Sequence, residues 1–224
     1  LTSCRTAFAG GFNAVKLYFM LGLPTETDED VLGIADLANK VHRVWRESAS
    51  NRARGVRITV STSCFVPKSH TPFQWEAQNT RAEYLRKVHL LRDNLKNRSV
   101  TYNWHDPETS LLEAVFSRGD RRLGDALELA FRRGAKFDSW SEYFDLPRWE
   151  QAFSDCGLDP AFYANRARTR GELLPWSVIS DGVTDSYLWF EREACYSALI
   201  TPDCRVQCTG CGANRFCEGG VCRV

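Results

Sequence analysis

Strand-forming and helix-forming segments alternate through the first 104 residues, and this order constrains the fold more than any other feature of the sequence. Runs of apolar and β-branched residues occupy 15–21 (VKLYFML), 56–65 (VRITVSTSCF) and 99–104 (SVTYNW). Between them, residues 27–45 and 80–96 repeat apolar positions at helical spacing. Strands joined through helices are typical of parallel βαβ units. The sequence therefore predicts an α/β fold, and the unbroken run at 15–21 predicts a strand buried on both faces.

Three parallel strands with their helices on one side leave an open edge and an uncovered face of the sheet. Helical segments follow from His105 to about residue 199 and would cover only part of that face. We therefore expect further strands from a missing N-terminal half. The chain begins at Leu1 and stops within a cysteine-rich segment, so we treat it as a fragment of a longer protein.

Composition indicates a globular chain without a dominant bulk charge. Hydrophobic residues make up 43% and charged residues 25%, and the formal net charge is +1. These values exclude a wholly disordered chain and give no general attraction to polyanions. No apolar run approaches the ~20 residues that span a bilayer, and the first residues lack the pattern of a signal peptide. We predict a cytoplasmic protein that makes no membrane contact.

Arginine outnumbers lysine 23 to 6 and is clustered at residues 43–57, 118–122 and 166–170. Such clusters could contact the phosphates of RNA. Every cluster has acidic neighbours in the sequence, which favours the simpler interpretation that the charges are balanced locally. RNA is therefore the less favoured partner.

Cysteine is concentrated at the end of the chain, where five of the nine cysteines fall in the last 21 residues. Cys204, Cys208 and Cys211 offer three thiolates within eight residues, a spacing suited to one soft metal ion or an iron–sulfur cluster. The fourth ligand is Cys217, Cys222 or an exogenous group. Zinc sites usually show two CxxC pairs and this segment has one, so iron–sulfur is mildly favoured over zinc.

A glycine–proline turn follows the first predicted strand, in the sequence GLPTET. Parallel sheets and barrels bind ligands at the carboxyl ends of their strands. Gly22 would allow close approach of a ligand, and the next helix N-terminus could offer N–H donors to a carboxylate or ribose. Spacing alone equally fits a plain turn with a capped helix. In the loop after the second strand, His70 is a candidate base, although a single loop histidine is more often structural.

Six segments in order resemble the back half of a radical S-adenosylmethionine (SAM) enzyme. More narrowly, the segments resemble an uncharacterised branch of this family that carries an N-terminal cobalamin-binding domain. The resemblance extends over nearly the whole chain. The segments are KLYFMLGLPTETDED, FVPKSHTPFQW, HDPETSLLEAVFSRGDRR, FDSWSEYF, LPWSVISDGV and TPDCR..CTGCG.

The resemblance implies a six-stranded partial (β/α) barrel. Residues 1–104 would form its last strands, residues 105–200 a helical extension, and residues 201–224 a cysteine-rich tail that binds a metal or cluster. Gly22, Leu23 and Pro24 match the turn near bound SAM. Val66 and Pro67 match the end of the next strand, near the adenine.

The cofactors that the resemblance implies are SAM and a 4Fe–4S cluster. The family binds that cluster through a CxxxCxxC motif near the first strand, which this sequence lacks. Cys204, Cys208 and Cys211 share the spacing but follow the barrel, and Gly210 stands where an aromatic residue is usual. We therefore interpret Cys204, Cys208, Cys211 and Cys217 as an auxiliary iron–sulfur or zinc site. Cobalamin would bind through the missing domain.

The sequence thus predicts the C-terminal fragment of an enzyme that cleaves SAM reductively, inactive by itself. Its partners would be the missing N-terminal barrel half with the cobalamin-binding domain and a substrate that no residue here identifies. The alternative is a zinc-stabilised RNA-binding module that uses the arginine clusters.

Overall fold

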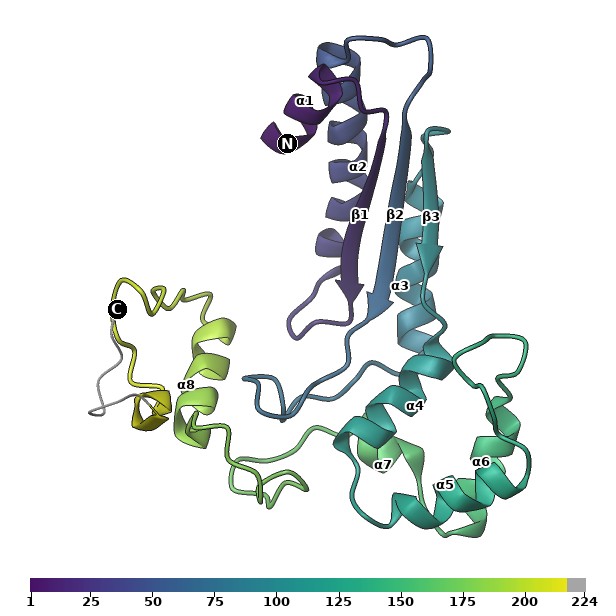
Figure 1. Cartoon of the computed structure of the whole chain (residues 1–224), viewed down its shortest axis with the longest axis vertical. Coiled ribbons are helices and arrows are strands. Elements are labelled where there is room, and N and C mark those ends of the chain that lie inside the picture. The colour runs from purple at the N-terminus through teal and green to yellow at the C-terminus, as the bar shows by residue number, and fades with distance from the viewer. Residues whose placement is uncertain (217–224) are drawn as a thin grey trace. The chain divides into compact units, whose positions relative to one another are not determined.

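The computed structural model describes residues 1–216, which divide into two compact units. The first unit comprises residues 1–65 and 79–110, and the second comprises residues 66–78 and the chain from residue 111 on. Figure 1 shows the elements of both units along the chain. Each unit is described by itself.

A three-stranded parallel sheet forms the centre of the first unit (Figure 1). Its strands are β1 (Ala14–Leu21), β2 (Arg57–Cys64) and β3 (Val100–Trp104), in the order β1-β2-β3. Helix α2 (Asp28–Ser48) connects the first two strands and α3 (Arg81–Asn94) the last two, and α1 (Thr2–Ala9) precedes the sheet and packs on α2. The predicted parallel α/β fold is confirmed for this unit.

Helices α2 and α3 cover one face of the sheet. Sequential strand order with right-handed crossovers places both connecting helices on the same side. The largest apolar core of this unit lies between them and the strands, with Leu21, Val31, Ile34, Ala35, Ala38, Val60, Tyr84, Val88 and Leu91. Phe8 of α1 extends this packing at the other end of α2, beside Val41, Val44 and Ile58.

The opposite face of the sheet is open. Side chains of β1 alternate between exposed and partly buried positions, and Tyr18 is 72% exposed. The prediction that residues 15–21 are buried on both faces is therefore wrong for this structure, because no layer of the described chain covers the side of Lys16, Tyr18 and Met20. The register pairs these residues with Thr59, Ser61 and Ser63 of β2, so the open face mixes hydroxyl groups with large side chains.

The second unit is helical. It contains most of α4 (Pro107–Arg118), then α5 (Leu123–Arg132), α6 (Leu146–Asp155), α7 (Pro160–Ala164), α8 (Asp185–Tyr196) and the short 3-10 helix η1 (Ala213–Phe216). One apolar core joins Val66 with residues of α4 to α7, and a smaller one contains Trp75, Leu174, Trp176 and Leu188. The loop at 66–78 thus packs with the helical unit.

The mixed α/β architecture is established, whereas a partial barrel stays a prediction, and so does the division at residues 104 and 200. Within residues 1–216, no helix is both long enough and apolar enough to cross a bilayer.

Candidate functional site

The turn after β1 requires glycine at position 22. Gly22 has a φ of 95°, in the region that favours glycine. A Cβ atom placed there would lie 2.9 Å from Oδ1 of Asn79, which is closer than real Cβ atoms approach an oxygen. The backbone at the carboxyl end of β1 therefore adopts a conformation that favours glycine, and a Cβ there would require the Asn79 side chain to shift.

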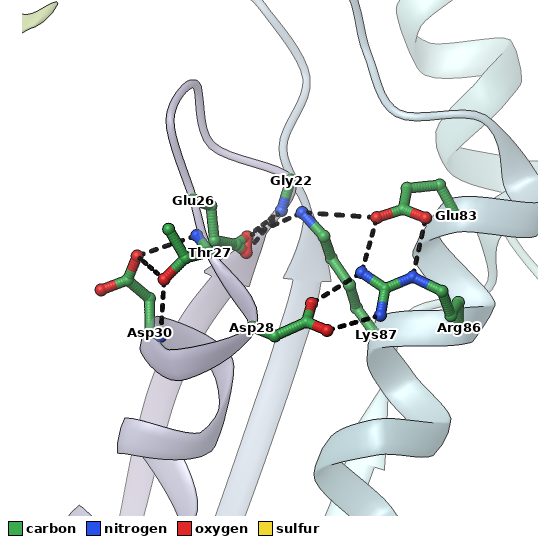
Figure 2. Close-up of polar contacts among 8 residues, drawn as sticks. All are labelled: Gly22, Glu26, Thr27, Asp28, Asp30, Glu83, Arg86 and Lys87. Carbon is green, nitrogen blue, oxygen red and sulfur yellow. Dashed lines mark hydrogen bonds and ion pairs between the residues drawn. The ribbon is translucent and has the colours of Figure 1, made fainter.

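A buried ion pair fixes this turn to α3 (Figure 2). The Gly22 N–H donates to both carboxylate oxygens of Glu26, at 2.5 and 3.1 Å. Nζ of Lys87 in α3 lies 3.5 Å from Oε2 of Glu26, and the two side chains are only 6% and 7% exposed. A charge this deeply buried is tolerated only with a partner. Glu26 therefore links the backbone of the turn to the helix behind the sheet.

An outer layer of charge joins the start of α2 to α3 (Figure 2). The Arg86 guanidinium donates to Asp28 at 2.7 and 3.0 Å and to Glu83 at 2.9 Å. These hydrogen bonds hold the pKa of Asp28 and the pKa of Glu83 below their ordinary values. Because two guanidinium nitrogens of Arg86 donate to the two carboxylate oxygens of Asp28, the ion pair is also fixed in its orientation.

The N-terminus of α2 is closed by its own capping box. Oγ1 of Thr27 accepts from the Asp30 N–H at 3.2 Å, and the Asp30 carboxylate accepts from the Thr27 N–H at 2.9 Å. Hydrogen bonds from the Thr27 backbone and side chain lower the pKa of Asp30. The N–H groups of Gly22 and Asp30 are thus used within the chain, which narrows the set of donors that the turn offers to a ligand.

A cavity of about 330 Å³ opens on the uncovered face of the sheet, toward the carboxyl ends of the strands. Its lining combines hydroxyls, a thioether, aromatic rings and an imidazole. The residues are Tyr18, Phe19, Met20, Ser61, Thr62, Ser63 and His105. This set can pack against an apolar or planar group and hydrogen-bond to a polar one.

His105 is the site residue that sequence reasoning missed. The sequence placed it only at the start of the helical segments, but its N–H donates to the carbonyl of Thr62 at 2.9 Å and continues the ladder between β2 and β3. His105 is therefore among the residues that line the cavity. The available signal was its place directly after a predicted parallel strand, where ligand-contacting residues occur.

The predicted site residues are divided between the two units. Gly22, Leu23 and Pro24 lie in the first unit, where Leu23 is partly exposed. Val66 and Pro67 lie in the second unit and are buried, and Val66 is part of its larger core.

His70 and Lys68 have partners inside the second unit. The His70 N–H donates to Oε1 of Gln74 at 3.0 Å, and Nδ1 of His70 lies 3.7 Å from the Asp181 carboxylate. Lys68 forms an ion pair with Glu113. These contacts favour the structural interpretation of His70 over a catalytic one.

Of the predicted metal ligands at the end of the chain, Cys204, Cys208 and Cys211 are free thiols. Cys204 and Cys208 are exposed and Cys211 is partly buried. Up to residue 216, no three His, Cys, Asp or Glu side chains come together as a metal-binding group. Cys217 and Cys222 lie outside the described residues. Thiols suit iron or zinc chemically, but Cys204, Cys208 and Cys211 are not gathered for coordination in this structure.

Two contacts attach this segment to the start of α8. The Thr184 N–H donates to the carbonyl of Cys211 at 2.9 Å. The hydroxyls of Tyr187 and Thr209 are 2.8 Å apart. The chain is therefore attached to the start of α8 at Thr209 and at Cys211.

Comparison with known proteins gives one distant relative. No family model matches the chain, and no solved structure matches it. An uncharacterized protein from Methanocaldococcus jannaschii is 29% identical over 148 residues, which are 66% of this chain and 31% of that protein. The matched part thus spans about a third of the relative's length, and the relative's description gives no activity.

Proposed function

We propose that this chain is the C-terminal part of a radical SAM iron–sulfur enzyme and that the carboxyl ends of β1 and β2 belong to its SAM site. The observation that supports this best is the glycine-only turn after β1, held in place by the buried Glu26–Lys87 pair. It lies at the edge where parallel α/β sheets bind their ligands. The proposal that the ligand is SAM comes from the six sequence segments that resemble this family in the same order.

The residues of the first unit have distinct roles in this proposal. Gly22 allows the left-handed backbone of the turn, where a Cβ would require the Asn79 side chain to shift. Leu23 and Pro24 offer apolar contact at the edge of the turn. Ser61, Ser63 and His105 supply hydrogen-bonding groups for the polar part of SAM in the cavity on the open face. Val66 and Pro67 contribute through the family resemblance alone.

The main 4Fe–4S cluster would supply the electron that cleaves SAM, and its ligands lie outside this chain. The chain by itself is therefore expected to bind SAM without turnover. Cys204, Cys208 and Cys211, with Cys217 or another fourth ligand, would hold an auxiliary cluster or metal only after the thiols approach one another. The missing barrel half, a cobalamin-binding domain and an unidentified substrate are the proposed partners.

The first test is titration of SAM into the chain by calorimetry. The variant His105→Ala combined with Ser63→Ala should weaken binding by about tenfold, since each lost hydrogen bond contributes about 0.5–1.5 kcal/mol. Thr101→Ala is the matched control, because Thr101 is an exposed hydroxyl residue of β3 outside the cavity lining. Equal binding by both variants would contradict this placement of SAM.

The second test is anaerobic reconstitution of the chain with iron and sulfide. A cluster absorbance that disappears when Cys204, Cys208 and Cys211 are changed to Ala would support the auxiliary site. Unchanged absorbance in that variant would refute it. Zinc bound at one equivalent in place of iron would favour the alternative, a zinc-stabilised module.

A further inference from the structure

A second concave surface lies at the amino ends of the strands, where the last turns of α2 meet the loops that lead into β2 and β3. Its cavity measures about 480 Å³. The lining is polar throughout and strongly basic, with Asn39, His42, Arg43, Arg46, Glu47, Arg52 and Asn97. Nothing in the proposed SAM site uses these residues.

The arginines of this cavity have no acidic partners. Within residues 1–216, Arg43, Arg46 and Arg52 take part in none of the ion pairs, although all three are exposed. Glu47, the single carboxylate of the lining, accepts from Arg5 at 2.9 Å instead. Each of the other two clusters has one arginine in an ion pair, Arg122 with Asp120 and Arg166 with Glu172, whereas Arg121 and Arg170 are exposed and form none within residues 1–216. The local charge balance that the sequence suggested for every cluster thus does not take the form of ion pairs at Arg43, Arg46 and Arg52 in the described part of the chain.

The uncompensated charge continues along the same edge of the sheet. Arg57 is the first residue of β2, and Arg98 stands two residues before β3. Parallel strands begin at one edge, so both arginines belong to the edge that carries the cavity. Arg54 lies in the loop that leads into β2. In the described part of the chain, none of these three forms an ion pair either. The basic edge is defined as Arg43, Arg46, Arg52, Arg54, Arg57 and Arg98.

We propose that the basic edge binds phosphate groups. A guanidinium presents a planar fork of donors that matches phosphate oxygens, and it stays charged at any physiological pH. Arg43, Arg46 and Arg52 around one cavity suit a ligand with more than one negative charge, such as a diphosphate or consecutive phosphates of a strand. Asn39 and Asn97 add neutral polar groups at the rim.

The chemistry of the edge also defines how binding will respond to salt. Exposed charges are screened by salt, with a Debye length of about 10 Å at 0.1 M and about 3 Å at 1 M. Binding to the basic edge is therefore expected to weaken steeply with salt. For a single strand of nucleic acid, each neutralised phosphate adds about 0.7 to the slope of log K against log salt.

The experiment compares two phosphate sources on the intact chain. Inorganic pyrophosphate is titrated by calorimetry, and a labelled single-stranded RNA of about 12 nucleotides, which is enough for one site, is followed by fluorescence anisotropy. Both are measured between roughly 50 and 200 mM salt. The test variant carries Arg43→Gln, Arg46→Gln and Arg52→Gln. The control variant carries Arg122→Gln, Arg132→Gln and Arg205→Gln, which removes the same charge from ion-paired arginines.

We expect the test variant to bind at least one probe about tenfold more weakly, and the control variant to bind as the unmodified chain does. If RNA is the source, the salt slope of the test variant falls by about 2. Saturable pyrophosphate binding would instead identify a small phosphorylated ligand. Binding of neither probe, or equal losses in both variants, would overturn the proposal.

Discussion

Charged residues are buried and paired at the carboxyl ends of the parallel strands, and exposed and unpaired in the basic edge at their amino ends. At the carboxyl ends of the strands, Glu26 and Lys87 are buried and paired, and Arg86 connects two carboxylates in the layer outside them. At the amino ends, the arginines of the basic edge are exposed and unpaired. The same strands and helices form both ends of the sheet. The two ends therefore differ in how far their charged side chains are buried, not in topology.

Burial explains this difference. Removing a charge from water costs several kcal/mol unless a partner compensates it, so charges inside the turn after β1 must be matched. An exposed charge keeps its hydration, and an exposed ion pair contributes only about 0–1 kcal/mol. Paired, buried charge therefore serves to fix the shape of the turn, whereas unpaired, exposed charge stays free for a ligand. The predictions below separate these two roles.

The largest expected effect is at the buried pair. Lys87→Met leaves the Glu26 carboxylate buried without its cation and should lower the free energy of unfolding by about 3–5 kcal/mol. Urea denaturation followed by circular dichroism measures it. The double variant with Glu26→Gln should recover much of the loss, because no buried charge is then left alone.

A matched control comes from an exposed ion pair in a helix. Arg132 and Glu128 are 2.6 Å apart and largely exposed. Glu128→Gln should change the free energy of unfolding by less than about 0.5 kcal/mol. A loss of stability in Lys87→Met as small as this would show that the Glu26–Lys87 pair contributes nothing to the stability of the turn.

The second effect is at Gly22. Gly22→Ala places a Cβ in a left-handed conformation and against Asn79, and it should cost about 1–3 kcal/mol. Gly33→Ala is the matched control: Gly33 lies inside α2 with open space around it. That change should raise the free energy of unfolding by roughly 0.5–1 kcal/mol. Thermal denaturation measures both changes. A loss of stability in Gly22→Ala together with a gain in Gly33→Ala would confirm that the conformation of this turn is what requires glycine at position 22.

The sequence predicted the backbone of the first unit well, because local signals sufficed. The β-favouring runs and the apolar period of α2 determine the strands and helix, and Thr27, the first residue of the predicted helical segment, is the N-cap of α2. Burial of 15–21 on both faces was predicted from composition alone. Whether a face is covered depends on which other elements pack there, and apolar Met20 and Tyr18 cannot reveal that.

The candidate site was predictable only in part, since its main contacts link residues far apart in the chain. Gly22 was identified from the turn sequence. Lys87, in contrast, is one of many charged residues in a helix, and only the fold brings it to Glu26. The same limit applied to the arginines: acidic neighbours in sequence suggested balance at Arg43 and Arg46, whereas in space Glu47 pairs with Arg5.

A third, smaller effect is at the cap of α2. Thr27→Ala removes the hydroxyl that accepts from the Asp30 N–H, and it should cost about 1 kcal/mol near neutral pH. Asp30 has its pKa lowered in the folded chain by hydrogen bonds from Thr27, from an ordinary value of 3.8. A lowered folded pKa gives stability that is present above this value and is lost as the pH falls through the folded pKa.

The difference between Thr27→Ala and the unmodified chain should therefore shrink on acidification. Urea denaturation at about pH 6 and about pH 3 measures it, on either side of the ordinary aspartate pKa. A difference that grows toward low pH would contradict the assigned hydrogen bonds between Thr27 and Asp30.

The smallest effect on stability, and the one that most sharpens the comparison, is at the basic edge. Changing Arg43, Arg46 and Arg52 together to Gln should leave the chain equally stable or raise the free energy of unfolding by less than about 0.5 kcal/mol at low salt. The gain arises because like charges no longer repel one another. It should vanish at about 1 M salt, where the Debye length is about 3 Å. Denaturation at both salt concentrations measures it. A loss of stability that is independent of salt would mean that these arginines hold the fold together, as Lys87 does at the other edge, and would remove the reason to assign them to a ligand.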